Sequence, residues 1–197
     1  MKRYRSIAIA ILVLLGCSQN AEKNATITEN NGLKTDSFFP VTSFIKGQMI
    51  ILDSLPVTPL RLTSIKGNTD SVWLTKTALK QQLQSFLTPA INETGLTKYF
   101  KETKFNDQTL NTVTFTYEPI IVLPASITLR HWDVYINPQT GTVTKVYIVK
   151  AIKKDDQLFT QQLTWQTDKL AKISTFLNKP DETMNLLKEV VFIWKFD

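Results

Sequence analysis

One short stretch combines residue types that could carry out acid–base chemistry at a spacing that would bring them together. His131, the only histidine of the chain, is followed by Asp133 and Tyr135. Residues two apart in an extended strand share a face, so the three side chains would point the same way. A histidine beside a carboxylate can act as a general base. The same pattern fits the solvent-facing polar stripe of a half-buried strand, which we favour because no Gly-x-Ser-x-Gly nucleophile motif accompanies it.

Other patterns for catalysis, metal binding or phosphate binding are missing from the sequence. Cys17 is the only cysteine, so neither a disulfide within the chain nor a thiolate metal site can form. Asp155 and Asp156 stand beside two lysines and lack the alternating acidic spacing of a calcium loop. The six glycines are scattered, and none belongs to a phosphate-binding loop. We therefore expect no metal and no cofactor, and we favour a non-catalytic role.

The N-terminus has the pattern of an export signal. Three basic residues precede the apolar run Ile7–Leu15, and Gly16 and Cys17 follow it. A charged start, a short apolar run and a small residue before the cut are typical of a cleaved signal peptide. The nine-residue run is much shorter than the roughly 20 residues that a membrane-spanning helix needs. We expect cleavage between Gly16 and Cys17.

The sequence Leu14-Leu15-Gly16-Cys17 resembles the lipobox of bacterial lipoproteins. This resemblance implies that Cys17 carries a lipid such as palmitate and becomes the first residue of the mature chain, and that the protein sits in the cell envelope. By analogy with enterobacterial sorting, Ser18 implies the outer membrane, with the protein facing the periplasm. An ordinary signal peptide with a chance cysteine is the alternative.

The sequence divides into three parts. Residues 1–16 are the predicted signal peptide, 17–36 a lipidated flexible tether, and 37–197 a single folded domain. The tether is polar and has too few large apolar residues to order itself. Without the leader, 20 basic and 17 acidic residues remain. That balance is unlike the basic surface of a nucleic-acid-binding protein.

Hydrophobic periodicity predicts an α+β fold. A helix is expected over Asp36–Leu55 with Asp36 or Ser37 as N-cap, a second after Thr75 with a stop at Pro89, and a short third over Thr94–Phe100. The strands, including Leu60–Ile65 and Ser71–Leu74, predict an antiparallel meander of about six strands with two to three helices packed on it.

Two strand regions carry further information. His131–Ile136 and Thr142–Ile152 flank a turn in which Gly141 would be the left-handed residue of a bulged hairpin. Val190–Phe196 is apolar on both faces, so we expect it inside the sheet and not at an edge.

The whole chain resembles the uncharacterised small lipoproteins of Bacteroidota. The resemblance rests on the lipobox leader, on Asp36–Val41 at the start of the domain, and on Val134–Val143 as the central hairpin. It implies an envelope location and brings no activity. The hairpin alone also resembles the Asn/Asp-Pro-x-Thr-Gly turn of PepSY-type domains.

Two further features bear on function. Asp53-Ser54-Leu55 and Asp70-Ser71-Val72 resemble the Asp-Ser/Thr-aliphatic sites of O-glycosylation in Bacteroidota, which makes Ser54 and Ser71 candidate sites. The four tryptophans and 11 phenylalanines are enough to line an apolar cavity, although such aromatic residues more often form the core.

Three hypotheses follow from these observations. The first is a lipid-anchored envelope protein that binds a partner or takes part in assembly, with its membrane contact through Cys17. The second is a carrier of lipid or another apolar ligand in a sheet-lined cavity. The third is an enzyme that uses His131 and Asp133. Nucleic acid is not an expected partner of any of them.

Overall fold

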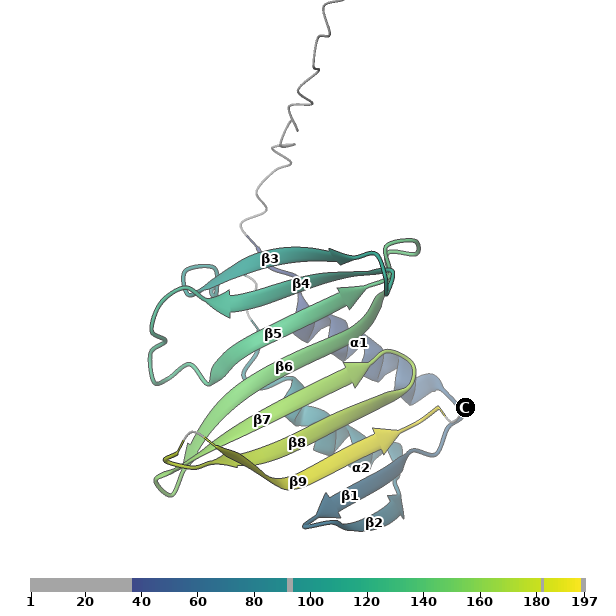
Figure 1. The fold of residues 1–197 in the computed structure, drawn as a ribbon. Helices are drawn as coiled ribbons and strands as arrows, with labels where there is room; N and C mark the ends of the chain where they lie inside the picture. Colours follow the sequence, from purple (N-terminus) through teal and green to yellow (C-terminus); the bar gives the residue numbers. More distant parts are fainter. Residues whose placement is uncertain (1–36, 92–93, 182, 196–197) are drawn as a thin grey trace, which may run out of the picture. The chain divides into compact units, whose positions relative to one another are not determined.

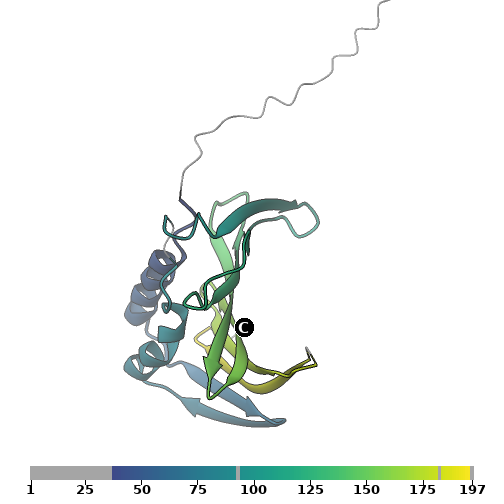
Figure 2. The same ribbon diagram turned by 90° about the vertical axis from the view of Figure 1, so that its left-hand side faces the viewer.

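The computed structural model describes residues 37–91, 94–181 and 183–195. These residues form one antiparallel sheet of nine strands, and the helices all lie on one of its sides (Figures 1 and 2). The predicted α+β class with an antiparallel sheet is confirmed, whereas the predicted number of about six strands was wrong. The predicted signal peptide, Cys17 and the tether lie outside the described residues.

Two α-helices and a 3-10 helix accompany the strands. The helices are α1 (Val41–Ser54) and α2 (Lys76–Gln82), and the 3-10 helix η1 (Leu83–Phe86) directly follows α2. The strands are β1 (Leu60–Ile65), β2 (Asn68–Trp73), β3 (Phe100–Asp107), β4 (Thr112–Pro119), β5 (Leu129–Ile136), β6 (Val143–Lys154), β7 (Gln157–Gln166), β8 (Leu170–Asn178) and β9 (Met184–Ile193).

The sheet joins a long meander to a separate hairpin. Its strand order is β2-β1-β9-β8-β7-β6-β5-β4-β3. Strands β3 to β9 follow one another in sequence and in space, and the hairpin β1–β2 pairs with the last strand through β1. β9 therefore lies between β1 and β8, which confirms the predicted interior position of the apolar C-terminal strand.

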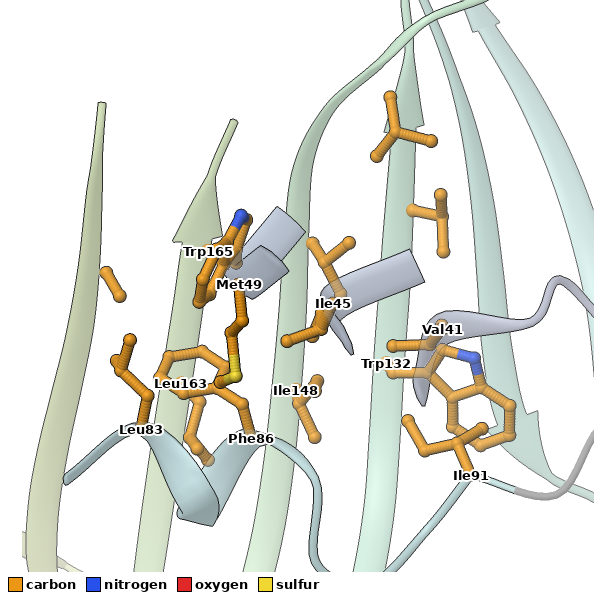
Figure 3. Packing of buried hydrophobic residues seen from close by; sticks show 14 of the residues in the cluster. Val41, Ile45, Met49, Leu83, Phe86, Ile91, Trp132, Ile148, Leu163 and Trp165 are labelled. Atoms are coloured by element: carbon orange, nitrogen blue, oxygen red, sulfur yellow. The ribbon is translucent and has the colours of Figure 1, made fainter. Parts of the chain in front are cut away.

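The helix α1 packs on the sheet through a single apolar face. Four of its apolar residues are buried, at positions i, i+4, i+8 and i+11 (Val41, Ile45, Met49 and Leu52). Figure 3 shows three of them pointing at buried side chains of β5, β6 and β7 (Trp132, Ile148, Leu163 and Trp165). Residues of η1 fill the space beside them, so the core lies between the helices and the sheet.

Aromatic side chains form part of this core, as expected from the composition. The rings of Trp132 and Tyr117 stack with centroids 4.6 Å apart, and Phe38 contacts both edge-on. Trp165 and Trp194 are also buried. Trp73 differs, because it lies on the edge strand β2 and 61% of it is exposed.

The turn between β5 and β6 has the predicted geometry. Gly141 has a φ of 69°, the left-handed conformation that glycine adopts at little cost. Its N–H donates to the carbonyl of Asn137 at 2.8 Å. The side-chain oxygen of Asn137 accepts hydrogen bonds from the backbone N–H groups of Gln139 and Thr140. The register shift beside Ile136 shows the bulge.

Helix α1 starts later than predicted. It begins at Val41 with Pro40 as the N-cap residue, so Ser37 does not cap it, and Asp36 lies outside the described residues. The two preceding phenylalanines are drawn toward the core instead, where the backbone N–H of Phe39 donates to the hydroxyl of Tyr117 at 3.2 Å. The second helix begins as predicted, because the Thr75 hydroxyl accepts a bond from the N–H of Ala78.

The predicted third helix over Thr94–Phe100 was wrong. Residues 94–99 form turns, and β3 begins at Phe100 and pairs with β4 over eight residue pairs. β3 is an edge strand that is exposed over most of its length, so it lacks the alternation of apolar residues that marks a half-buried strand. Backbone pairing with β4, which residue types do not reveal, defines it.

Two strand boundaries also differ. β2 begins at Asn68, so the turn before it consists of Lys66 and Gly67, both with positive φ. This two-residue turn matches the twist of the flanking strands. β9 begins at Met184 and not at Val190, because its polar first half pairs with β8 along its backbone.

Candidate functional site

The side of the sheet opposite the helices carries the residues that the sequence singles out. We call it the helix-free face. β5 directs Trp132 and Val134 into the core, where both are fully buried. Strand alternation then places His131, Asp133 and Tyr135 together on the helix-free face. The structure therefore brings all three predicted residues together.

Asp133 is the centre of this group. One carboxylate oxygen, Oδ1, accepts a hydrogen bond from the Thr116 hydroxyl at 2.7 Å. The other, Oδ2, lies 3.0 Å from Nε2 of His131 and accepts a bond from the Tyr135 hydroxyl at 3.4 Å. Only 8% of Asp133 is exposed. A carboxylate that is this buried needs such partners, because an unpaired buried charge is strongly unfavourable.

The electrostatics of the pair favour its charged form. The hydrogen bond to Asp133 raises the pKa of His131 against the opposing effect of burial. Burial alone would raise the pKa of Asp133, but hydrogen bonds from His131 and Thr116 outweigh it and hold that pKa below its usual value. An ion pair between imidazolium and carboxylate is the resulting state at mildly acidic pH.

Two residues of β6 complete the group, and sequence reasoning did not find them. Lys145 pairs with Tyr135 across the strands, and its ammonium lies 3.7 Å from the centre of the Tyr135 ring. Tyr147 pairs with Asp133, and its ring meets His131 edge-on at 6.2 Å. Burial raises the pKa of Tyr135 to about 12, with Asp133 adding to the effect. Both phenols therefore remain neutral donors at physiological pH.

A groove opens beside this group on the helix-free face. The end of the β3–β4 hairpin bends away from the helices (Figure 2). It borders a groove of about 700 Å³ with the strands β5 to β7. Most of the lining side chains carry hydroxyl, amide or charged groups (Asp107, Thr112, Thr114, Thr116, Asp133, Tyr135, Thr144, Lys145 and Gln166), and Phe105 and Leu110 are apolar.

His131 lies beside the groove and not in its lining. Its side chain is 29% exposed, and its Nε2 faces Asp133. Of the predicted group, Asp133 and Tyr135 reach the groove, together with Thr116 of the neighbouring strand. The alternating threonines of β4 were the signal for this lining, since every second residue of a strand faces the same side.

The described residues contain no cluster of three or more histidine, cysteine, aspartate or glutamate side chains that could hold a metal ion. Asp155 and Asp156 form the turn between β6 and β7, both with positive φ. Lys153 forms an ion pair with Asp156 at 3.1 Å. This agrees with a solvated turn.

The other predicted site residues lie far from the groove or outside the described part of the chain. Ser54 is exposed at the end of α1, where its hydroxyl donates to the carbonyl of Ile51 at 2.7 Å. Ser71 is exposed on the edge strand β2. Both serines are therefore accessible, and their glycosylation stays a prediction. The cleavage site at Gly16 and Cys17 lies outside the described residues.

The helix side holds a buried lysine that sequence reasoning also missed. Lys150 is only 4% exposed, and its ammonium donates to the carbonyls of Ser85 and Thr88. These carbonyls lie at the end of η1, where a positive charge is favourable. Burial lowers the pKa of Lys150 to about 8. The lysine ties the 3-10 helix to β6 and has a structural role.

No protein-family model matches this chain, and no curated protein or solved structure matches it either. Within the described residues, no helix is both long and apolar enough to cross a bilayer.

Proposed function

We propose that this protein is a lipid-anchored cell-envelope protein, held in the outer membrane through Cys17 and facing the periplasm, whose helix-free face binds a hydrophilic ligand without transforming it. The observation that carries the binding role is the groove of about 700 Å³ lined by hydroxyl, amide and charged groups. The anchor is supported by the lipobox-like sequence at Leu14–Cys17.

A hydroxyl-rich ligand, such as a saccharide of the envelope, suits this lining best. Gln166 offers an amide that donates and accepts, the threonine hydroxyls do both, and Asp133 holds Thr116 and Tyr135 in place. Tyr135 and Phe105 add ring surface on which the apolar edge of a sugar can rest. An apolar ligand would leave these polar groups without partners, which costs binding energy.

The alternative of an apolar-ligand carrier finds less support. Between α1 and α2, the cavity bordered by Met49, Leu79 and Leu83 measures only about 10 Å³. A space of that size barely holds one water molecule. The apolar side chains between these two helices thus leave no space for a ligand.

A second candidate function is an enzyme that uses His131 as a general base. The 3.0 Å contact between His131 and Asp133 favours it, because a carboxylate can orient a histidine and stabilise its protonated form. In that arrangement Nε2 is engaged with Asp133 and Nδ1 is the nitrogen left for a substrate. Steady turnover of an envelope substrate that is abolished by His131→Ala would establish this function in place of the first.

The test of the binding role is native mass spectrometry of the protein extracted gently from its own envelope, followed by a denaturing mass of the same sample. We expect an added hydrophilic mass that is lost on denaturation. Asp133→Asn and Thr116→Val should reduce its occupancy. Thr160→Val is the matched control, because Thr160 lies on the same face outside the groove. An added mass that matches a lipid would favour the carrier instead.

A further inference from the structure

One end of the strands carries exposed apolar side chains in several neighbouring segments. Three chain segments lie at this end, namely the β4–β5 loop (residues 120–128), the β6–β7 turn (155–156) and the described residues of the β8–β9 turn (179–181 and 183), all on the left in Figure 1. We call this the loop end. It carries six large apolar side chains that are at least 44% exposed (Ile120, Ile121, Val122, Leu158, Met184 and Leu186).

The β4–β5 loop is the most exposed of the three segments. Ile120 and Ile121 are each 51% exposed, and Val122 is 96% exposed. Both sides of this tip are fixed to the domain, since the N–H of Ile120 donates to the carbonyl of Tyr99 and Leu123 packs against the core. Three consecutive aliphatic side chains are thus exposed to solvent on a loop whose two ends are fixed. Contiguous exposed apolar surface of this kind marks a contact with a partner or a membrane.

The start of the folded domain lies toward the same end. Phe38 contacts Tyr117, and the N–H of Phe39 donates to the hydroxyl of the same residue. Tyr117 lies two residues before the end of β4 and hence close to the loop. The segment 17–36 connects this point to the proposed lipid on Cys17. A flexible chain of this length reaches about 25 Å, so the anchor would keep the loop end near the membrane.

Charge at the loop end is nearly balanced. Six basic residues (Lys98, Lys101, Arg130, Lys153, Lys154 and Lys179) stand among four acidic ones (Glu118, Asp155, Asp156 and Asp181) in its described loops and strand ends. The ammonium of Lys98 lies 4.8 Å from the centre of the Tyr99 ring. Lysine and tyrosine beside an aliphatic tip are typical of the membrane interface. Because the charges at the loop end nearly cancel, apolar contact rather than charge must supply the energy of binding to a membrane.

We propose that Ile120, Ile121 and Val122 insert into the interfacial region of a lipid bilayer, with Leu158, Met184 and Leu186 as a second contact. The groove residues Asp107, Thr112 and Gln166 lie at the other ends of their strands. Docking through the loop end would therefore turn the groove toward the water. The argument from the tether rests on the anchor proposed above, whereas the exposure of the loop does not.

The experiment uses the mature chain with Cys17→Ser, so that no lipid is attached and no other cysteine remains. Ala125→Cys introduces an exposed labelling site beside the tip, and Gln139→Cys introduces one in the β5–β6 turn at the opposite end. Each variant carries an environment-sensitive fluorophore. With vesicles of phosphatidylethanolamine and phosphatidylglycerol, we expect a blue shift and an increase in intensity at position 125 and no change at position 139.

A serine triple variant tests which side chains are responsible. Ile120→Ser, Ile121→Ser and Val122→Ser together should weaken vesicle binding by about tenfold or more, since each aliphatic side chain loses its transfer out of water. The matched control is Ile50→Ser with Ile51→Ser, which removes exposed apolar surface from α1. It should bind vesicles like the parent chain, and added salt should have little effect. If the triple variant does not fold, Val122→Asp replaces it in the test, because this position is almost fully exposed and tolerates a charge. It should weaken vesicle binding as well.

Three results would overturn the proposal. The first is unchanged vesicle binding by the triple variant. The second is an equal response, or no response, at positions 125 and 139. The third is a blue shift at position 125 that grows with protein concentration in the absence of vesicles, which would mean that a second copy covers the loop. Because the chain carries no lipid, each outcome is independent of the anchor at Cys17, which labelling of cells with radioactive palmitate tests separately.

Discussion

The Thr116 hydroxyl donates to Oδ1 of Asp133 at 2.7 Å across the β4–β5 pair. This bond leaves Oδ2 to His131 and Tyr135. The strand register sets the arrangement, because Thr116 and Asp133 are directly opposite each other. Asp133 therefore joins three side chains of the helix-free face, and its replacement should remove a hydrogen-bond partner from each of them.

The first prediction concerns the pKa of His131. Asp133→Asn removes the negative charge that favours the imidazolium, so the pKa of His131 should fall from above 6.5 toward or below that ordinary value. NMR titration of the imidazole resonances measures it directly, since His131 is the only histidine. Thr116→Val is the control, because it keeps the Asp133 charge and should leave most of the upward shift. An unchanged pKa in Asp133→Asn would contradict the ion pair.

The second prediction concerns stability as a function of pH. The raised pKa of His131 contributes stability that is complete below 6.5 and lost as the pH rises through the folded-state value. The lowered pKa of Asp133 contributes stability that is complete above 3.8 and lost as the pH falls through its folded-state value. The free energy of unfolding of the parent protein should thus exceed that of His131→Gln by more at pH 5.5 than at pH 8.5. Urea denaturation of both proteins at the two pH values measures this difference. A difference independent of pH would rule out the pair as its source.

The third prediction concerns the buried lysine under η1. Burial lowers the pKa of Lys150 from 10.5 to about 8, so the unfolded chain binds more protons than the folded one between these values. Stability relative to Lys150→Met should therefore rise with pH across this window, by at most about 1.4 kcal/mol per pH unit. Urea denaturation at several pH values measures the difference. A fall across the same window would show that the ammonium is better stabilised in the folded protein than in water.

The fourth prediction compares two glycines. Gly141 has a φ of 69°, so Gly141→Ala should lower the free energy of unfolding by about 1 kcal/mol. Gly47 lies inside α1, and a Cβ there would meet nothing within 4 Å. Gly47→Ala should therefore raise the free energy of unfolding by about 0.5–1 kcal/mol. Thermal denaturation of the two variants gives the comparison, and effects of equal sign would contradict it.

Much of the fold was predictable where sequence pattern and packing coincide. The buried face of α1, the Thr75 cap, the turn at Gly141 and the interior position of β9 all follow from local residue types. The edge strand β3 was not predictable in this way, because only backbone pairing with β4 defines it. The start of α1 also depends on contacts distant in sequence, since Tyr117 holds the residues before the helix.

The candidate site shows the same division. Strand alternation predicted that His131, Asp133 and Tyr135 share a face. It did not reveal Thr116 or Lys145, because the register between strands determines which residues stand opposite them. Lys150 escaped prediction for another reason. Its partners are backbone carbonyls at the end of η1. Every residue has such a carbonyl, so the sequence does not indicate which of them a lysine side chain will reach.

The pairing of β1 with β9 affects the order in which the chain can be completed. Ribosomes and export channels deliver a polypeptide from its N-terminus, so the β1–β2 hairpin emerges long before β9. In the meander its partner is β9, where Leu62 stands opposite Val191. Until β9 has been synthesised, the hairpin has no strand of the meander with which to pair. The β1–β2 hairpin therefore joins the sheet late, after the strands β3 to β8 that lie between it and β9 in the sequence.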